Sequence, residues 1–166
     1  MDIEFTSKDI LIVFGTNIRK SRELRGLGIA KLASLIKYDR GCLSSLEYGE
    51  QNIKYITALN LARKLNVPFP ALFSRHYLND NSPFIETFTE DDYLLVFIEN
   101  FKKAMIRKQI KQIEIYSATD IQTSLISRII NRKSLNPTIN TLYAMSYTVG
   151  EEMCALFSRN TIREDI

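Results

Sequence analysis

The sequence contains no tryptophan, one histidine and two cysteines among its 166 residues. Cys42 and Cys154 do not form a C-x-x-C pair, and His76 has no second histidine to join it in a metal site. No apolar run approaches the ~18 residues of a membrane span. The N-terminus, MDIEFTSKDI, lacks the basic start of a secretory signal. We therefore expect a cytoplasmic protein with no metal, no other cofactor and no membrane partner.

Motifs for catalysis are also missing. The sequence has no Gly-rich phosphate loop, and a single histidine without a ligand cluster cannot complete a catalytic constellation. We expect neither an enzyme nor a small-molecule substrate. Hydrophobic residues make up 45% of the chain and charged residues 25%, which is typical of a folded globular protein.

The net charge of +3 hides an uneven distribution. Residues 15–64 carry ten basic and four acidic side chains, and residues 101–133 carry eight and two. Acidic residues gather elsewhere, as at Glu90, Asp91 and Asp92. Two basic segments of this kind favour a polyanion through its phosphates. A solvated surface without any partner explains the same charges equally well.

The chain contains an internal duplication. Residues 5–14 read FTSKDILIVF and residues 88–97 read FTEDDYLLVF, with six of ten positions identical at a shift of 83. Residues 71–76 read ALFSRH and residues 155–160 read ALFSRN, with five of six identical at a shift of 84. Two matched blocks in the same order indicate two repeats, the second one residue longer between the blocks.

Each repeat predicts the same series of helices: a long amphipathic helix, two short helices around a tight turn, a fourth helix and a brief last one. No segment alternates with the period of a strand, so the predicted fold class is all-α. We expect a first domain over residues 1–75, a linker over 76–87, a second domain over 88–160 and a C-terminal tail over 161–166.

Both long helices have candidate capping residues at their start. Thr6 and Thr89 are predicted N-caps, and Asp9 and Asp92 follow three residues later. A carboxylate at that spacing can reach back to the cap residue, as in a capping box.

The first repeat resembles the phage-repressor-like helix-turn-helix family, also called XRE or Cro-type. The resemblance covers nearly the whole repeat. It rests on Ile18-Arg19-x-x-Arg22, Leu32-Ala33, Leu43-Ser44-x-Leu46-Glu47-x-Gly49, Leu61-Ala62-x-x-Leu65-x-Val67 and Leu72-Phe73. It implies two tandem lambda-repressor-like five-helix units joined by a short linker.

The second repeat matches this family less well. It retains Gln112-x-x-Ile115, the segment Ile121-Gln122-Thr123-Ser124-Leu125-Ile126-Ser127-Arg128-Ile129, Pro137-Thr138-Ile139 and Leu156-Phe157. Tyr116 stands where the family has a small alanine. Lys37 and Asp120 stand in the turns where the family commonly has glycine, which adopts left-handed backbone readily.

A paired change supports the alignment. The family resemblance implies a structural ion pair between Arg22 and Glu47 in the first repeat. At a shift of 83 these positions become Met105 and Ile130. Replacing both partners of a buried ion pair by apolar residues can be neutral, whereas losing one partner is costly.

A helix-turn-helix places its second helix in the major groove, where the N-terminal residues of that helix reach base edges. Arginine can bond bidentately to guanine, which makes Arg40 and Arg128 the strongest base-reading candidates, although an exposed arginine without a ligand remains the alternative for each. The full candidate set comprises Asp39, Arg40, Gly41 and Ser45 in the first repeat and Gln122, Thr123, Ser124 and Arg128 in the second.

The resemblance also implies phosphate contacts, which fix position without reading sequence. Gln112 stands where the family often has a phosphate-binding glutamine. Asn52, Lys54, Lys133 and Asn136 lie in the turns after the two recognition helices.

These features predict a sequence-specific regulator of transcription that binds double-stranded DNA, a repressor rather than an activator. The partner is DNA, bound by one chain or by a homodimer. The alternative is a module for protein interaction or dimerisation, with a protein partner, in which one or both units have lost DNA binding. Loss of the family glutamine in the first repeat, where Ile29 stands, gives this alternative some weight.

Overall fold

The computed structural model describes residues 8–77 and 87–159. Throughout these ranges the regular structure is helical, apart from one isolated antiparallel bridge between Lys54 and Thr138. The all-α prediction is therefore confirmed for the described residues. None of their helices has the length and apolar character required to cross a membrane.

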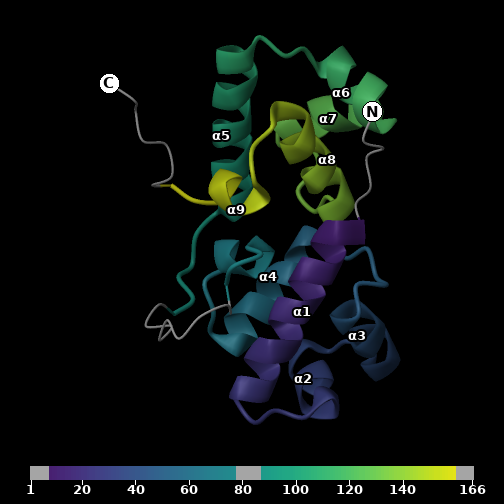
Figure 1. The fold of residues 1–166 in the computed structure, drawn as a ribbon, viewed down its shortest axis with the longest axis vertical. Helices are drawn as coiled ribbons and strands as arrows, with labels where there is room; N and C mark the ends of the chain where they lie inside the picture. The colour runs from purple at the N-terminus through teal and green to yellow at the C-terminus, as the bar shows by residue number, and fades with distance from the viewer. Residues whose placement is uncertain (1–7, 78–86, 160–166) are drawn as a thin grey trace.

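The helices follow one order twice along the chain (Figure 1). The first half contains α1 (Lys8–Leu24), α2 (Ile29–Ile36), α3 (Arg40–Glu47), α4 (Tyr55–Leu65) and the 3-10 helix η1 (Pro70–Phe73). The second half contains α5 (Tyr93–Lys108), α6 (Gln112–Thr119), α7 (Thr123–Ile130), α8 (Ile139–Val149) and α9 (Met153–Leu156). The two halves stack along the long axis of the molecule, with α8 and α9 next to the first half.

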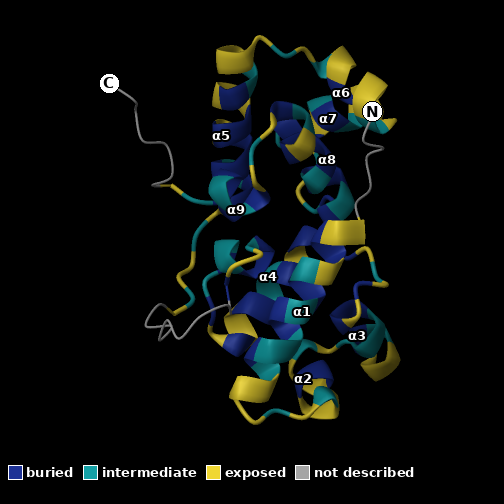
Figure 2. Ribbon diagram, in the orientation of Figure 1, coloured by how far each residue is buried: buried dark blue, intermediate teal, exposed yellow. Residues whose placement is uncertain are grey.

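Each helix forms because one side of it can be buried. In α4, Ala58, Leu61, Ala62 and Leu65 recur at helical spacing, and each is fully buried. Figure 2 shows the buried residues facing the interior of each half, while the exposed residues lie on the outer surfaces of α2, α3 and α6.

A buried asparagine ties the long helix of each half to the last helix of that half. Asn17 on α1 donates to two backbone carbonyls around the end of η1, at 2.9 and 3.0 Å. Asn100 on α5 donates to two carbonyls around the end of α9, again at 2.9 and 3.0 Å. The two asparagines correspond at the shift of 83, so this buried contact is the same in both halves.

Aromatic side chains join the halves. Phe157 lies 5.2 Å from Phe73 and 4.8 Å from Phe69, measured between ring centroids. The hydroxyl of Tyr55 accepts the backbone N–H of Leu94 near the start of α5, at 3.2 Å. Burial raises the pKa of Tyr55 to about 12. The first half therefore supplies a partner for an amide at the start of a helix in the second half.

The cap predicted for the second long helix is wrong. Asp92, and not Thr89, is the N-cap of α5, and its carboxylate accepts the backbone N–H of Leu95 at 3.0 Å. A carboxylate is a strong cap because it also interacts favourably with the helix dipole. The carbonyl of Thr89 instead accepts the Tyr93 hydroxyl at 2.5 Å. The corresponding prediction for Thr6 lies outside the described residues.

The turn after α2 contains one residue in an unfavourable backbone conformation, and a single substitution can relieve it. Lys37 ends α2 with φ 53°, a left-handed conformation that costs a non-glycine residue about 1–2 kcal/mol. Replacing this residue by glycine removes that cost. Glycine also makes the unfolded chain more flexible, which offsets about 0.4–1 kcal/mol of the gain in stability. We expect Lys37→Gly to raise the free energy of unfolding by about 0.5–1 kcal/mol in urea titrations.

Lys37→Ala is the matched control for this prediction, because it removes the charge and the long side chain but keeps the Cβ atom. Its stability should stay close to that of the native protein. An equal gain in both variants would mean that the lysine side chain, and not the left-handed backbone, limits stability here.

Candidate nucleic-acid interface

Two helix pairs, α2–α3 and α6–α7, form similar turns. Lys37 with φ 53° and Asp120 with φ 60° each end the first helix of the pair in left-handed backbone. Glycine is the usual residue for such a position, but lysine and aspartate adopt it here. Two residues later, Asp39 and Gln122 are the N-caps of α3 and α7.

The two caps differ in charge and in contacts. Asp39 accepts the backbone N–H of Cys42 at 2.8 Å, and this hydrogen bond lowers the pKa of the Asp39 carboxyl. A hydrogen bond to Asp39 in turn raises the pKa of the Cys42 thiol, which disfavours its reactive thiolate. Gln122 makes no side-chain capping bond to α7. The Gln122 side-chain amide therefore does not stabilise the start of its own helix.

Apolar residues fix both second helices to the core. Leu43 and Leu46 on α3, and Ile126 and Ile129 on α7, are at most 1% exposed. The base-reading candidates lie on the remaining surface. Asp39, Arg40, Gly41, Gln122, Ser124 and Arg128 are exposed, and Ser45 and Thr123 are half-buried.

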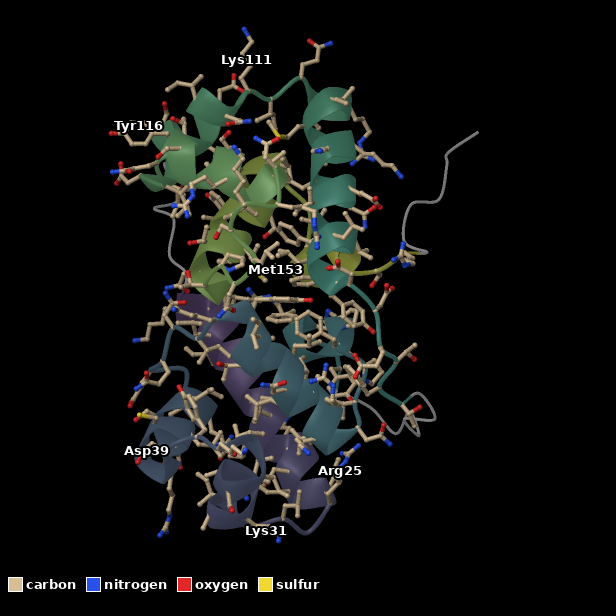
Figure 3. All side chains as sticks on the ribbon, turned by 180° about the vertical axis from the view of Figure 1, so that it is seen from behind. Arg25, Lys31, Asp39, Lys111, Tyr116 and Met153 are labelled. Atoms are coloured by element: carbon tan, nitrogen blue, oxygen red, sulfur yellow. The ribbon has the colours of Figure 1, made fainter. Side chains whose placement is uncertain are left out.

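The helices α3 and α7 face the same side of the molecule, one in each half (Figure 1). Seen from behind, Asp39 beside α3 and Tyr116 on α6 again project to one common side (Figure 3). The helices that carry the candidate residues of the two halves therefore lie on one side of the molecule, although they are far apart in sequence.

The phosphate candidates fall into two groups. Lys54 and Lys133 are exposed, and Gln112 is half-buried at the start of α6. Asn52 and Asn136 lie between the halves. The Asn136 side-chain oxygen accepts the backbone N–H of residue 56 at 2.9 Å, and that of Asn52 accepts the N–H of residue 140 at 3.2 Å.

These two asparagines belong to a reciprocal contact around the isolated bridge. Tyr55 donates its backbone N–H to the Pro137 carbonyl at 2.9 Å, and Ile139 donates to the Ile53 carbonyl at 2.8 Å. Each bonding residue corresponds to one in the other half at the shift of 84. The contact thus has approximate two-fold symmetry, and it holds the segments that follow α3 and α7 together.

An ion pair supports α3 alone. Arg22 on α1 bonds both carboxylate oxygens of Glu47, at 2.6 and 2.9 Å, and donates to the Leu27 carbonyl at 2.8 Å. The Glu47 side chain is only 3% exposed. The hydrogen bond between Arg22 and Glu47 raises the pKa of the Arg22 guanidinium. The corresponding Met105 and Ile130 leave α7 with an apolar environment at this point.

The long helix also lies closer to the second helix of the pair in the first half. A Cβ atom added to Gly15 would be 2.2 Å from the backbone oxygen of Leu46, so α1 approaches the backbone of α3 directly. Ile98 occupies the corresponding position on α5 and is buried. Because isoleucine needs the space that glycine leaves empty, α5 makes little direct contact with α7.

Within residues 8–77 and 87–159, no group of three or more candidate metal ligands occurs. His76 is exposed just after η1.

No protein-family model matches the chain. A curated protein, "Control protein C.SmaI" of Serratia marcescens, is 29% identical over 79 residues. The match covers 48% of this chain and 94% of that protein. Nearly all of the bacterial control protein is therefore similar to a stretch about as long as one repeat of this chain.

Proposed function

We propose that this chain is a DNA-binding regulator of transcription built from two tandem lambda-repressor-like units of the phage-repressor-like helix-turn-helix type. The observation that carries the proposal is the placement of α3 and α7 on one side of the molecule, each after a left-handed turn. The similarity to a protein named as a control protein supports the regulatory part.

Base reading is assigned to the start and outer face of each second helix. Arg40 begins α3 and Arg128 lies in the last turn of α7, and both are exposed. Bidentate bonding to guanine is the contact that arginine makes best in the major groove. The remaining candidates are Asp39, Gly41, Ser45, Gln122, Thr123 and Ser124.

Phosphate binding is assigned to Lys54, Lys133 and Gln112. Asn52 and Asn136 are assigned to phosphate as well, through their side-chain NH2 groups, since only their oxygens accept the backbone N–H groups of the opposite half. The two second helices then enter successive major grooves, which requires them to lie about one helical turn of DNA, ~34 Å, apart. The operator has only rough two-fold symmetry because the reading residues of the two helices differ. Binding of this kind blocks transcription and makes a repressor the favoured outcome.

Fluorescence anisotropy with selected and random duplexes tests the proposal. The native protein should prefer the selected duplex, and Arg40→Ala or Arg128→Ala should each reduce that preference by about 1–3 kcal/mol. Lys133→Ala should instead weaken binding to both duplexes alike and lower the slope of log affinity against log salt by about one unit. Lys103→Ala, at an exposed position on α5 outside the candidate residues, is the charge control and should change neither.

The second candidate is a protein-interaction module. It is supported by Lys37 and Tyr116, which depart from the family pattern in and beside the turns. A module of this kind should show no salt-sensitive affinity for DNA, because counterion release accompanies phosphate binding. Absence of such affinity in the native protein would therefore reject the regulator and favour the module.

A further inference from the structure

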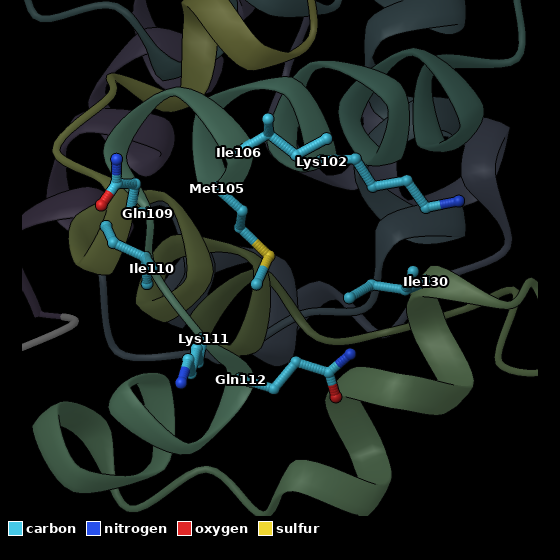
Figure 4. A pocket seen from close by; sticks show the side chains of 8 residues that line it. All are labelled: Lys102, Met105, Ile106, Gln109, Ile110, Lys111, Gln112 and Ile130. Carbon is cyan, nitrogen blue, oxygen red and sulfur yellow. The ribbon is translucent and has the colours of Figure 1, made fainter.

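A wide, shallow groove of about 460 Å³, called the cavity below, lies open to solvent between α5, the start of α6 and the end of α7. Its lining is mostly apolar and includes Met105, Ile106, Ile110 and Ile130. Figure 4 shows Met105 pointing into the middle of the opening. Ile106 is 79% exposed at the edge of this opening.

Two contacts of the first half are absent from the second half, which contains the cavity. Arg22 and Glu47 bridge α1 and α3, whereas their counterparts Met105 and Ile130 cannot bond to each other. Gly15 lets α1 reach the backbone of α3, whereas Ile98 keeps α5 and α7 apart.

The charges around the cavity indicate what fills it. Lys102 and Lys111 stand on opposite sides of Met105, and none of the eight lining residues is acidic. Gln109 and Gln112 add amide donors. An apolar floor of this volume with a few polar groups at its edge is typical of a small-molecule site.

We propose that this cavity binds a small amphipathic anion, an aliphatic chain ending in a carboxylate. The chain packs against Met105, Ile110 and Ile130, and the carboxylate lies at one of the two lysine side chains on the rim, Lys102 or Lys111. Two lining residues, Gln112 and Ile130, belong to the α6–α7 pair, so the ligand contacts the element that we assign to DNA. The binding itself does not depend on DNA, so its failure would leave the proposed function standing.

Titration of the whole chain with hexanoate, octanoate and decanoate, followed by NMR of labelled methyl groups, tests this site. We expect one saturable site with shifts at Met105 and Ile130, and an affinity that rises about two- to four-fold per added methylene. Lys102→Gln with Lys111→Gln should weaken octanoate binding and leave the binding of 1-octanol unchanged, because only the carboxylate uses the positive charges.

Met105→Arg with Ile130→Glu should rebuild the ion pair of the first half, close the cavity and abolish binding. Ile106→Gln, at a highly exposed position that tolerates a polar side chain, keeps the test valid if that double variant does not fold. It should lower octanoate affinity at least three-fold, while Leu24→Gln, 72% exposed on α1, should not.

Three results would overturn the proposal. One is the absence of saturable octanoate binding, and another is binding that neither Ile106→Gln nor the double variant changes. The third is self-association of the chain in sedimentation experiments that Ile106→Gln removes, because this would show that a second copy occupies the cavity.

Discussion

Replacing Arg22 by methionine is expected to lower the free energy of unfolding by about 3–5 kcal/mol. The substitution leaves the Glu47 carboxylate, 3% exposed, without its partner at 2.6 Å. A buried charge without a partner is far more costly than the loss of one surface interaction, which is worth about 0–1 kcal/mol. Urea unfolding monitored by circular dichroism measures the effect.

The double variant Arg22→Met with Glu47→Ile should recover most of that loss. It places in the first half the pair that the second half already carries as Met105 and Ile130, and apolar replacements of buried ion pairs are often neutral. A double variant as unstable as the single one would show that the pair is needed for packing and not only for charge balance.

Gly15→Ala is expected to destabilise the protein by about 3 kcal/mol, the upper part of the usual range for overpacked cores. The new methyl group would meet the backbone oxygen of Leu46 at 2.2 Å and that of Glu47 at 2.8 Å. Backbone atoms cannot rotate away as a side chain can, so α1 and α3 must separate. Since α3 is the proposed reading helix, Arg40 should move with it, and DNA affinity should fall with stability.

Gly41→Ala is the matched control. Gly41 also lies in a helix, but the nearest atom to its added Cβ is a side-chain oxygen of Asp39 at 3.1 Å, which can move. Alanine is the better helix former by about 0.5–1 kcal/mol, so this variant should be as stable as the native protein or more so. If Gly15→Ala were equally harmless, α1 and α3 would not be packed as closely as the structure shows.

The sequence predicted the features that depend on local pattern. The all-α class followed from helical periodicity and the absence of alternating segments. Helical spacing predicts six apolar anchors for the second helices, namely Tyr38, Leu43, Leu46, Ile121, Ile126 and Ile129. Four of them are buried, while Tyr38 and Ile121 are half-buried against the core. These assignments succeed because an apolar residue at helical spacing has one physical role in a helix of this size.

Features that depend on contacts between distant residues were not predicted. The phosphate contacts predicted for Asn52 and Asn136 stay predictions, but the bonds that their oxygens accept across the two halves were not foreseen. The sequence of a turn does not show which partner a polar residue in it will bond. Only the correspondence of Asn52 with Asn136 at the shift of 84 pointed to a shared role. The cavity beside Met105 was not predicted either, because its lining residues come from α5, the loop after it, α6 and α7, which only the fold brings together.

The reciprocal contact between the halves determines how the pairing of the two units depends on protein concentration. Two separate subunits joined through such a surface come apart on dilution, so their paired form becomes scarce at low concentration. Here one chain supplies both sides, and the pairing is independent of concentration. For the DNA function proposed above, occupancy of one operator would rise with the first power of protein concentration rather than the second. A gene controlled in this way would respond in a graded manner from the first copies made, without the threshold that assembly from separate subunits imposes.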